Sequence, residues 1–508
     1  LEAVGGFDGS ETRVASTPEG GATRVFIPVL SAARPTGGES IGWGAGRAWP
    51  VGQDAAFAAE LARRHVTTGG VIQAVADAVD RGIALARSLR PLAPGSALAR
   101  SHGTEFPIVQ GPMTRVSDRA AFAEAVAGGG ALPFLALAML REAEIRGLLD
   151  EVRTRLDGRP WGVGLLGFVD PELRREQIRA VRDFRPPFAL IAGGRADQAK
   201  ELEDAGIRTY LHAPSPGLLA RQLRDGARRF VLEGRECGGH VGPRSSLVLW
   251  EQAVGTLLEF IEAGGAAEDL HVLFAGGVHD ARSAAVAAAM AAPLAARGVK
   301  VGVLAGTAYL FTEEVVASGA VVPGFQEEAL RCRSTVLLET GPGHEVRVGA
   351  SPFAEAFADL RRRLAAEGRT AEEVRLRLEE MNAGRLRIAT KGLERANGPG
   401  SKLVSVDASG QRERGAYMLG QAAALRDRVV TIADLHRAIS EESDVLLQAV
   451  EAPSVAKDAA PAPSDVAIIG ISAIMPGAGD ARTFWERTLR KVDSIVEIPS
   501  DRWDWRTY

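Results

Sequence analysis

The feature that most constrains the fold is an alternation of apolar and amphipathic segments between residues 105 and 340. Short apolar stretches have the length of strands, and longer stretches with helical spacing separate them. The short stretches are apolar at consecutive positions, as parallel strands buried between helices are. The expected strands are 106–109, 132–135, 161–167, 188–191, 209–211, 230–233, 271–275 and 299–305.

This alternation predicts an α/β fold, a TIM (βα)8 barrel. Eight strand–helix units over about 240 residues have the size of such a barrel. A doubly wound open sheet shows the same alternation and is the alternative. The expected helices are 119–127, 142–155, 171–184, 196–205, 217–225, 248–262 and 281–295.

Composition narrows the class of protein. The chain has 508 residues, with 60 Lys and Arg against 64 Asp and Glu, and a formal net charge of −4. This balance argues against a general nucleic-acid binder, and no apolar run is long enough for a membrane span. Two cysteines, Cys237 and Cys332, cannot build a disulfide framework, so we expect a reducing, cytoplasmic setting.

Changes in composition divide the chain outside the barrel. Residues 1–22 are polar and Gly-rich without periodicity, and we expect them to be disordered or clipped. The barrel is expected to occupy 104–450, together with a charged, helical C-terminal extension. Residues 451–464 have the Ala- and Pro-rich composition of an interdomain linker, and a new segment, 465–508, follows it.

An internal repeat suggests a tandem arrangement. Gly52-Gln53 and Gly420-Gln421 are each followed by alanines and an amphipathic helix. We interpret 23–95 as the C-terminal tail of an upstream copy of the same domain, plus a connector. Chance similarity between two Ala-rich helices is the alternative.

Glycine-containing dipeptides at the ends of two late strands predict a phosphate site. Gly276-Gly277 follows one strand, and Gly306-Thr307 follows the next. Glycines allow backbone N–H groups to approach a phosphate, and the last two strand loops of barrel enzymes commonly form such a site. A single Gly-Gly dipeptide would be weak evidence for a phosphate site. Gly-Gly followed by Gly-Thr, at the ends of consecutive strands, is a more specific signal.

Two further loops are expected at the same end of the barrel. Gly111-Pro112-Met113 turns sharply after the first strand, so its backbone and Met113 could face a flat ligand. Gly238, Gly239 and His240 lie on a loop after the strand at 230–233. A histidine on such an open loop suits general acid or base work, although it could also only pack beside the ligand. Cys237, in the same loop, is expected to be a small buried thiol.

The other histidines are weaker candidates. We expect His65 and His102 to be surface or connector residues, His212 to line the barrel mouth, and His344 to lie on a loop that closes the site. A structural role is expected for the rest: His271, His279 and His436. No pair of histidines has the spacing of a metal site, and no metal is predicted.

The motifs FPIVQGPM, EGRECGGHVG, FAGGV and LAGT, in this order, resemble the FMN-binding barrel of the nitronate monooxygenase (2-nitropropane dioxygenase) family. That family includes flavin enoyl-acyl-carrier-protein reductases. The closer likeness is to the enoyl reductase of polyunsaturated fatty acid and polyketide synthases, whose barrel carries a C-terminal helical extension. GAYMLGQAAALRDRVVTIADLH is similar to the end of that extension, and the match runs from about Thr104 to Val450.

The resemblance implies roles for individual residues. It makes His240 the catalytic general acid or base, and it places Gly238 and Gly239 beside the flavin ring. Asparagine is usual in monooxygenases at Gly164, so this departure favours the synthase-type reductase. The residues that the resemblance and the motifs together assign to FMN are Gly111, Pro112, Met113, Gly164, Gly238, Gly239, Gly276, Gly277, Gly306 and Thr307.

The end of the chain carries a second resemblance. Residues 465–508, which begin DVAIIGISAIMPG, are similar to the N-terminal edge of a β-ketoacyl synthase. The nucleophilic cysteine of that family lies beyond this segment, so it cannot condense acyl chains by itself. It implies that the chain is a piece of a multidomain synthase.

Together the resemblances imply an FMN-dependent enoyl reductase. NADPH or NADH would be the electron donor and an enoyl thioester on an acyl carrier protein the substrate. The other domains of the synthase would be partners, with no nucleic acid and no membrane. Homodimerisation stays open. The alternatives are a nitronate monooxygenase that uses O₂ and a non-catalytic barrel that serves as a docking spacer.

Overall fold

A computed structural model describes residues 12–16, 22–26, 53–341, 344–396, 401–450, 470–495, 497–498 and 502–503. The chain divides into two compact units, 1–450 and 451–508. The expected linker at 451–464, and most of the segments 1–22 and 23–52, lie outside the described residues.

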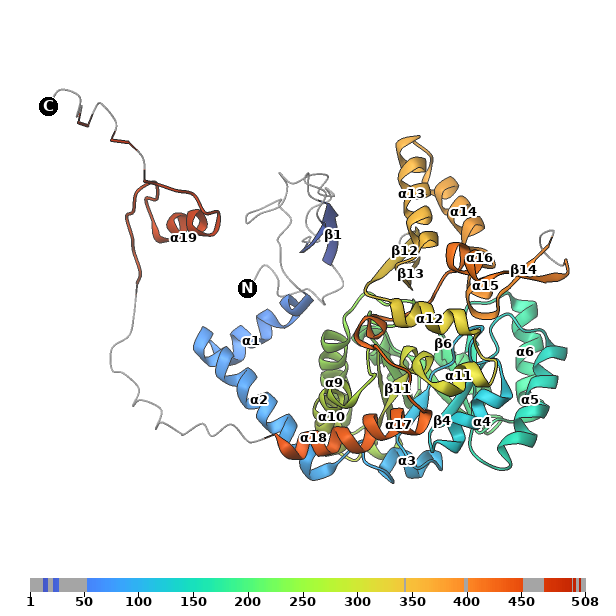
Figure 1. The fold of residues 1–508 in the computed structure, drawn as a ribbon. Coiled ribbons are helices and arrows are strands. Elements are labelled where there is room, and N and C mark those ends of the chain that lie inside the picture. Colours follow the sequence, from blue (N-terminus) through green and yellow to red (C-terminus); the bar gives the residue numbers. More distant parts are fainter. Residues whose placement is uncertain are drawn as a thin grey trace. The chain divides into compact units, whose positions relative to one another are not determined.

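Eight parallel strands close into a barrel within the first unit (Figure 1). The closed order β10-β11-β3-β4-β5-β6-β7-β8 confirms the predicted TIM barrel and excludes the open sheet. Each expected strand is present within two residues of its predicted bounds. The strands are β3 Ile108–Gln110, β4 Leu132–Ala136, β5 Gly162–Leu166, β6 Phe188–Ala192, β7 Arg208–His212, β8 Arg229–Glu233, β10 His271–Ala275 and β11 Lys300–Ala305.

Helices between the strands form the outer layer of the barrel (Figure 1). Their starts follow capping chemistry. Asp170 accepts from the Glu172 N–H at 2.8 Å, Ser215 from the Leu218 N–H at 3.2 Å, and each precedes a proline at the first helical position. The helices are α4 Ala120–Gly128, α5 Glu142–Leu156, α6 Pro171–Phe184, α7 Ala196–Glu203, α8 Pro216–Arg224, α9 Ser246–Glu262, α10 Ala281–Ala295, α11 Glu313–Ala317 and α12 Pro323–Arg331, with the short turns η4 Ala267–Asp269 and η5 Thr307–Phe311.

The core has two layers. One cluster fills the inside of the barrel and includes Phe134, Phe188 and Tyr210, all fully buried. A larger cluster lies between the strands and the surrounding helices. The strands are therefore apolar on both faces, which explains why their sequence shows no alternation.

Helix α3 (Ala97–His102) closes the amino-terminal end of the barrel. Its Leu98 belongs to the cluster inside the barrel. The expectation that His102 is a surface or connector residue is wrong, since His102 is 2% exposed and its Nε2 lies 2.6 Å from the Tyr210 hydroxyl. The sequence around His102 has the composition of a connector, yet it forms a helix. Contacts with the barrel stabilise this helix, which has no helical periodicity of its own.

The C-terminal extension is not only helical. A hairpin of β12 (Thr335–Gly341) and β13 (His344–Gly349) precedes its helices, and β9 (Gly239–His240) joins it as a third strand. His344 therefore begins a strand and is not the loop residue that the sequence indicated. The remaining elements are α13 Pro352–Ala366, α14 Ala371–Asn382, α15 Arg385–Lys391, β14 Leu393–Arg395, β15 Leu403–Ser405, α16 Ala408–Arg414, η6 Gln421–Leu425, α17 Ile432–Arg437, η7 Ala438–Glu442 and α18 Ser443–Ala449.

The segment before the barrel also has regular structure. Strands β1 (Thr12–Ser16) and β2 (Ala22–Phe26) pair antiparallel, although the sequence pattern indicates an irregular segment at 1–22. The turn η3 (Gln53–Phe57) leads into α1 (Ala58–His65) and α2 (Thr68–Leu89), and α2 packs on α10.

In the second unit the described helix is α19 (Ala481–Leu489), which Asp480 caps through the Thr483 N–H at 2.7 Å. Among the helices of the described residues, none has both the length and the apolar composition to cross a membrane.

Gly302 tests how tightly the barrel is packed. A Cβ at this position in β11 would lie 2.4 Å from the Pro107 carbonyl oxygen and 2.3 Å from Leu98. We expect Gly302→Ala to lower the free energy of unfolding by about 1–3 kcal/mol, measured by urea denaturation.

The matched control is Gly255→Ala on the exposed face of α9, where a Cβ meets nothing within 4 Å. We expect this change to raise stability by about 0.5–1 kcal/mol, because alanine favours the helix. Equal effects of the two substitutions would contradict the described packing of Gly302.

Candidate active site

The turn after β3 lies against the end of β11, so residues far apart in sequence meet at the barrel mouth. The Gly111 N–H donates to the Ala305 carbonyl at 2.9 Å. The Met113 sulfur lies 3.7 Å from the position that a Cβ would take on Gly306. Two of the expected flavin loops are thus adjacent, and the thioether of Met113 lies beside the expected phosphate site.

Pro112 occupies the space beside Gly164. A Cβ on Gly164 would lie 2.2 Å from the Pro112 Cβ and 2.5 Å from its Cγ. Real Cβ atoms do not approach so closely, so an asparagine side chain has no room at position 164 unless Pro112 moves. The structure therefore gives a steric reason for glycine here.

The loop after β10 needs glycine at both of its first positions. Gly276 and Gly277 have φ values of +97° and +98°, which L residues with side chains rarely adopt. Gly276 is also crowded, since a Cβ would lie 2.5 Å from the Ser246 Oγ and 2.6 Å from the Gly234 nitrogen.

These loops carry hydrogen-bond donors that have no internal acceptor. Among the described residues, the backbone N–H groups of Gly276, Gly277 and Gly306 donate to no protein group. The three glycines are half-buried, and backbone N–H groups that glycine leaves accessible fit an anionic ligand such as the phosphate of FMN. The Gln110 side chain adds a buried oxygen without a partner in the described part of the chain.

The loop that carries His240 is bound to the extension. Gly239 and His240 pair with Arg347 and Val346 of β13, and the Val241 N–H donates to the Glu345 carbonyl at 3.2 Å. The buried guanidinium of Arg347 donates to the Arg235 carbonyl at 3.0 Å. The position of His240 therefore depends on a hairpin that lies outside the barrel.

His240 itself is exposed, in a T-shaped contact with Phe168 (ring centroids 6.4 Å apart). Desolvation and, to a smaller extent, the nearby His344 lower the pKa of His240 below 6.5. A neutral imidazole therefore predominates near pH 7, with one nitrogen able to accept a proton and the other able to donate a hydrogen bond.

Cys237 matches the expectation of a buried thiol. Its Sγ lies 3.3 Å from the His240 carbonyl oxygen, to which it donates. Burial, as the largest cause, raises the pKa of Cys237 well above its usual value, so the reactive thiolate is disfavoured.

Gly420 joins the extension to the site, and sequence reasoning recognised it only as part of the repeat. Its N–H donates to the Thr307 Oγ1 at 2.9 Å, and the next N–H, of Gln421, donates to the Glu236 carbonyl at 2.9 Å. A Cβ on Gly420 would lie 2.7 Å from that carbonyl oxygen and 3.0 Å from the Gly238 nitrogen. The expected site residues Gly238 and Thr307 are therefore brought together through Gly420.

Glu233 and His212 form a pair that sequence reasoning did not identify. They end the neighbouring strands β8 and β7, and the Glu233 Oε2 lies 3.5 Å from the His212 Nδ1. Burial raises the pKa of Glu233 to about 7 and lowers the pKa of His212 to about 4. Both groups are therefore mainly uncharged between pH 5 and 6.5. The only signal in the sequence was their place at strand ends.

The remaining histidines have structural contacts. His436 Nε2 lies 2.7 Å from the Tyr309 hydroxyl, His279 Nδ1 lies 2.7 Å from the Gly277 carbonyl oxygen, and His271 contacts Tyr210. Within the described ranges, no group of three or more His, Cys, Asp or Glu residues is arranged to hold a metal ion.

Fold and site together define a (βα)8 barrel with glycine-rich loops at the carboxyl end of its strands. Solved structures share this fold. FabK from Thermotoga maritima is 24% identical with a TM-score of 0.55, over 69% of this chain and 96% of that one. The enoyl reductase domain of MlnA from Bacillus amyloliquefaciens is 14% identical with a TM-score of 0.52, over 70% and 98%.

Curated relatives fall into two groups. A nitronate monooxygenase of Pseudomonas aeruginosa is 28% identical over 289 residues, which cover 48% of this chain and 77% of the relative. Residues 463–508 match the family "Beta-ketoacyl synthase, N-terminal domain". Polyketide synthase ThaG of Burkholderia thailandensis is 52% identical over 44 residues, 9% of this chain. The chain spans only 1–2% of the length of the first polyketide synthases that it matches.

These findings confirm both resemblances that the motifs indicated. The barrel is similar to nitronate monooxygenase and enoyl reductase proteins, and the C-terminal segment is similar to polyketide synthases.

Substitution of Gly420 tests the link between the extension and the site. We expect Gly420→Ala to lower the free energy of unfolding by about 1–3 kcal/mol, because a methyl group would overlap the Glu236 carbonyl and displace the loop around Gly238. Urea denaturation measures the change. Gly217→Ala in α8, where a Cβ meets nothing within 4 Å, is the control and should leave stability unchanged or slightly higher.

The Glu233 carboxyl should make stability depend on pH. Because its pKa rises from 4.5 to about 7 on folding, the folded state binds more protons than the unfolded state between these values. The free energy of unfolding should therefore fall as pH rises from 5 to 8, by up to about 3 kcal/mol. Glu233→Gln should remove this fall, measured as the change in urea midpoint between the two pH values.

His212 contributes a rise in stability from about pH 4 to 6.5, because its folded pKa is lowered. Wild type and variant share this contribution, so their difference isolates Glu233. Glu259→Gln on exposed α9 is the control. A Glu233→Gln profile that follows the wild type would show that Glu233 is ionised in the folded state.

Proposed function

We propose that the barrel is an FMN-dependent oxidoreductase that reduces enoyl thioesters on an acyl carrier protein, within a type I polyketide or polyunsaturated fatty acid synthase. The observation that carries the proposal is the set of backbone N–H groups of Gly276, Gly277 and Gly306, which donate to no protein group among the described residues. The glycine loops would hold FMN, which would supply hydride transfer between NADPH or NADH and the β-carbon of the substrate.

The residues of the chain would bind and orient the reactants. The N–H groups of the glycine loops would hold the phosphate, and Thr307, which accepts a hydrogen bond from Gly420, could donate its own proton to the same group. Met113 would pack beside the flavin ring. His240 would supply or orient the proton that the α-carbon of the substrate gains as the hydride reaches the β-carbon.

The synthase context rests on the C-terminal segment. Its match to the β-ketoacyl synthase N-terminal domain and to polyketide synthases supports work alongside other synthase domains and an acyl carrier protein.

The second candidate function is nitronate oxidation with O₂, which the likeness to the Pseudomonas aeruginosa protein supports. The packing of Pro112 against Gly164 disfavours it, because the position at which monooxygenases usually carry asparagine is closed to a side chain. A docking barrel without activity is disfavoured by the unpaired donors, which a spacer has no need to keep.

We also propose that the segment 23–95 is the C-terminal tail of a preceding copy of this domain plus a connector, an interpretation that the described residues 53–89 support. After each Gly-Gln pair a 3-10 helix follows, η3 and η6. Thr67 caps α2, which comes after α1, and Thr431 caps α17, which comes directly after η6. Each threonine accepts from the N–H three residues on at 3.0 Å. Against the present barrel, the Gln53 side chain accepts from the Ser245 N–H at 2.8 Å and donates to the Pro243 carbonyl at 2.7 Å.

Anaerobic spectroscopy tests the function. We expect the full chain, incubated with FMN and desalted, to keep a yellow flavin spectrum, to bleach with NADPH or NADH, and to recover its colour with crotonyl thioester. Protein that stays colourless after incubation with FMN contradicts the proposal. Recovery with O₂ and a nitronate, but not with the thioester, would favour the second candidate.

Two variants separate the role of His240 from flavin binding. We expect His240→Ala to keep the flavin spectrum and lose at least tenfold in kcat for thioester reduction, since general acid–base groups contribute about 10²–10⁴-fold. His65→Ala on α1 is the control and should keep the wild-type rate. Full turnover by His240→Ala would remove the assigned proton role and leave the flavin proposal intact.

A further inference from the structure

A second cluster of charged residues lies at the opposite, amino-terminal end of the barrel. Four neighbouring strands each begin with a basic residue: Arg208 in β7, Arg229 in β8, His271 in β10 and Lys300 in β11. His271 is in register with Arg229 on one side and with Lys300 on the other.

These side chains point into the barrel opening. Side chains two residues apart on a strand share a face. Tyr210, Val231 and Leu273, two residues after the first three basic positions, belong to the cluster inside the barrel. The first residues of these strands therefore form the lowest layer of the interior.

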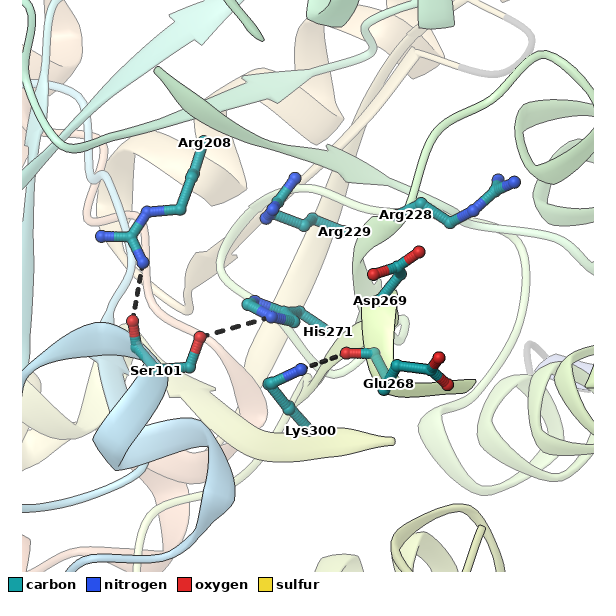
Figure 2. A pocket seen from close by; sticks show the side chains of 8 residues that line it. All are labelled: Ser101, Arg208, Arg228, Arg229, Glu268, Asp269, His271 and Lys300. Carbon is teal, nitrogen blue, oxygen red and sulfur yellow. Dashed lines mark hydrogen bonds between the residues drawn. The ribbon is translucent and has the colours of Figure 1, made fainter. Parts of the chain in front are cut away.

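The basic layer borders a cavity of about 260 Å³ (Figure 2). Arg228, the Ser101 of α3 and the turn η4 complete its wall. Figure 2 shows Arg208 and Ser101 at one side, with Lys300 beside Glu268 at the other. The carboxylates of Glu268 and Asp269 on η4 are exposed to solvent, so water screens their charge.

The cations in the wall are held mainly by uncharged acceptors. Arg208 donates to the Ser101 carbonyl at 2.6 Å, Arg228 to the Ala227 carbonyl at 2.8 Å, and Lys300 to the Glu268 carbonyl. In the described part of the chain, no carboxylate lies within 4.0 Å of these three cationic groups.

Arg229 is the exception, and only in part. It pairs with Glu203 at 2.8 Å, but its Nε is buried and has no partner among the described residues. The positive field reaches His271, whose pKa falls to about 3 through desolvation first and then through Arg229, Lys300 and Arg208. The imidazole therefore stays neutral, with its Nε2 3.4 Å from the Ser101 hydroxyl.

Such a cluster of cations lowers the stability of the barrel, so stability alone does not explain its presence. The cations Arg229 and Lys300 lie on the two sides of the neutral His271, where like charges repel one another, and apolar residues could fill the same layer. Stability sacrificed at one place typically marks a functional site.

We propose that this cavity binds a small phosphate-bearing anion. Guanidinium forks match phosphate oxygens, and a phosphate monoester carries nearly two negative charges, which suits several cations around one space. The small, concave cavity fits one such group, whether from inorganic phosphate or from a phosphate monoester, and has no room for a peptide helix. Since the amino-terminal face of such barrels serves stability, the ligand would stabilise the fold and leave the proposed flavin chemistry untouched.

Thermal unfolding of the full chain tests the proposal. With inorganic phosphate titrated at constant ionic strength set by sodium chloride, we expect a saturable rise in Tm of about 2–4 °C. Adenosine monophosphate forms the second arm. A half-maximal concentration below that of inorganic phosphate would identify a phosphate monoester as the preferred source, and the reverse order would identify the free ion.

Substitutions then test whether phosphate binds in this cavity. We expect Lys300→Gln to raise the half-maximal phosphate concentration at least tenfold, and Arg208→Gln/Lys300→Gln to abolish the saturable shift. Because like charges are removed, neither variant should unfold at a lower temperature than wild type without phosphate. Lys200→Gln, on the exposed surface of α7, is the control and should keep the wild-type response.

Three results would overturn the proposal. The first is a wild-type shift no larger than that with chloride alone. The second is an unchanged phosphate response in Lys300→Gln. The third is a shift with oligoglutamate but not with phosphate, which would assign the cluster to an acidic peptide. If the double variant does not fold, the single Lys300→Gln titration still decides.

Discussion

The candidate site depends on two backbone hydrogen bonds from the extension, those of Gly420 to Thr307 and of Gln421 to Glu236, both at 2.9 Å. They reach the barrel mouth between the loop with the Gly306-Thr307 pair and the loop that carries His240. Glycine is needed at 420 because neighbouring backbone atoms leave no room for a Cβ. A barrel closed by its own eight strands would be stable without these bonds, but its loops would lack their common support.

Each end of the barrel has positively polarised or charged groups without an anionic partner, and the kind of group differs between the two ends. At the carboxyl end, N–H donors of Gly276, Gly277 and Gly306 lack acceptors among the described residues. At the amino end, guanidinium and ammonium groups are satisfied mainly by carbonyl oxygens. Both ends therefore favour negative charge, and an apolar cluster fills the interior between them.

The parts of this fold that obey local rules could be predicted from sequence. The barrel strands could be found because burial on both faces makes them apolar throughout, and α6 begins at Pro171 and ends at Phe184 as its caps indicate. The hairpin β12–β13 could not be found, because its strands are stabilised by pairing with each other and with β9. His102 was misjudged for a similar reason, since its burial comes from Tyr210 on a strand more than a hundred residues away. Within the site, the residues that belong to sequence motifs could be identified. Gly420 and Glu233 could not, because their roles come from contacts with residues distant in sequence, Thr307 and His212.

The pairing of β9 with β13 decides where this domain can be cut. As the outer strand of its three-stranded sheet, β9 finds its backbone partners in residues more than a hundred positions later. A chimera that joined the barrel of this chain to the extension of another protein would leave the His240 segment to pair with a foreign strand. Barrel and extension should therefore be transferred together, as one stretch through Val450.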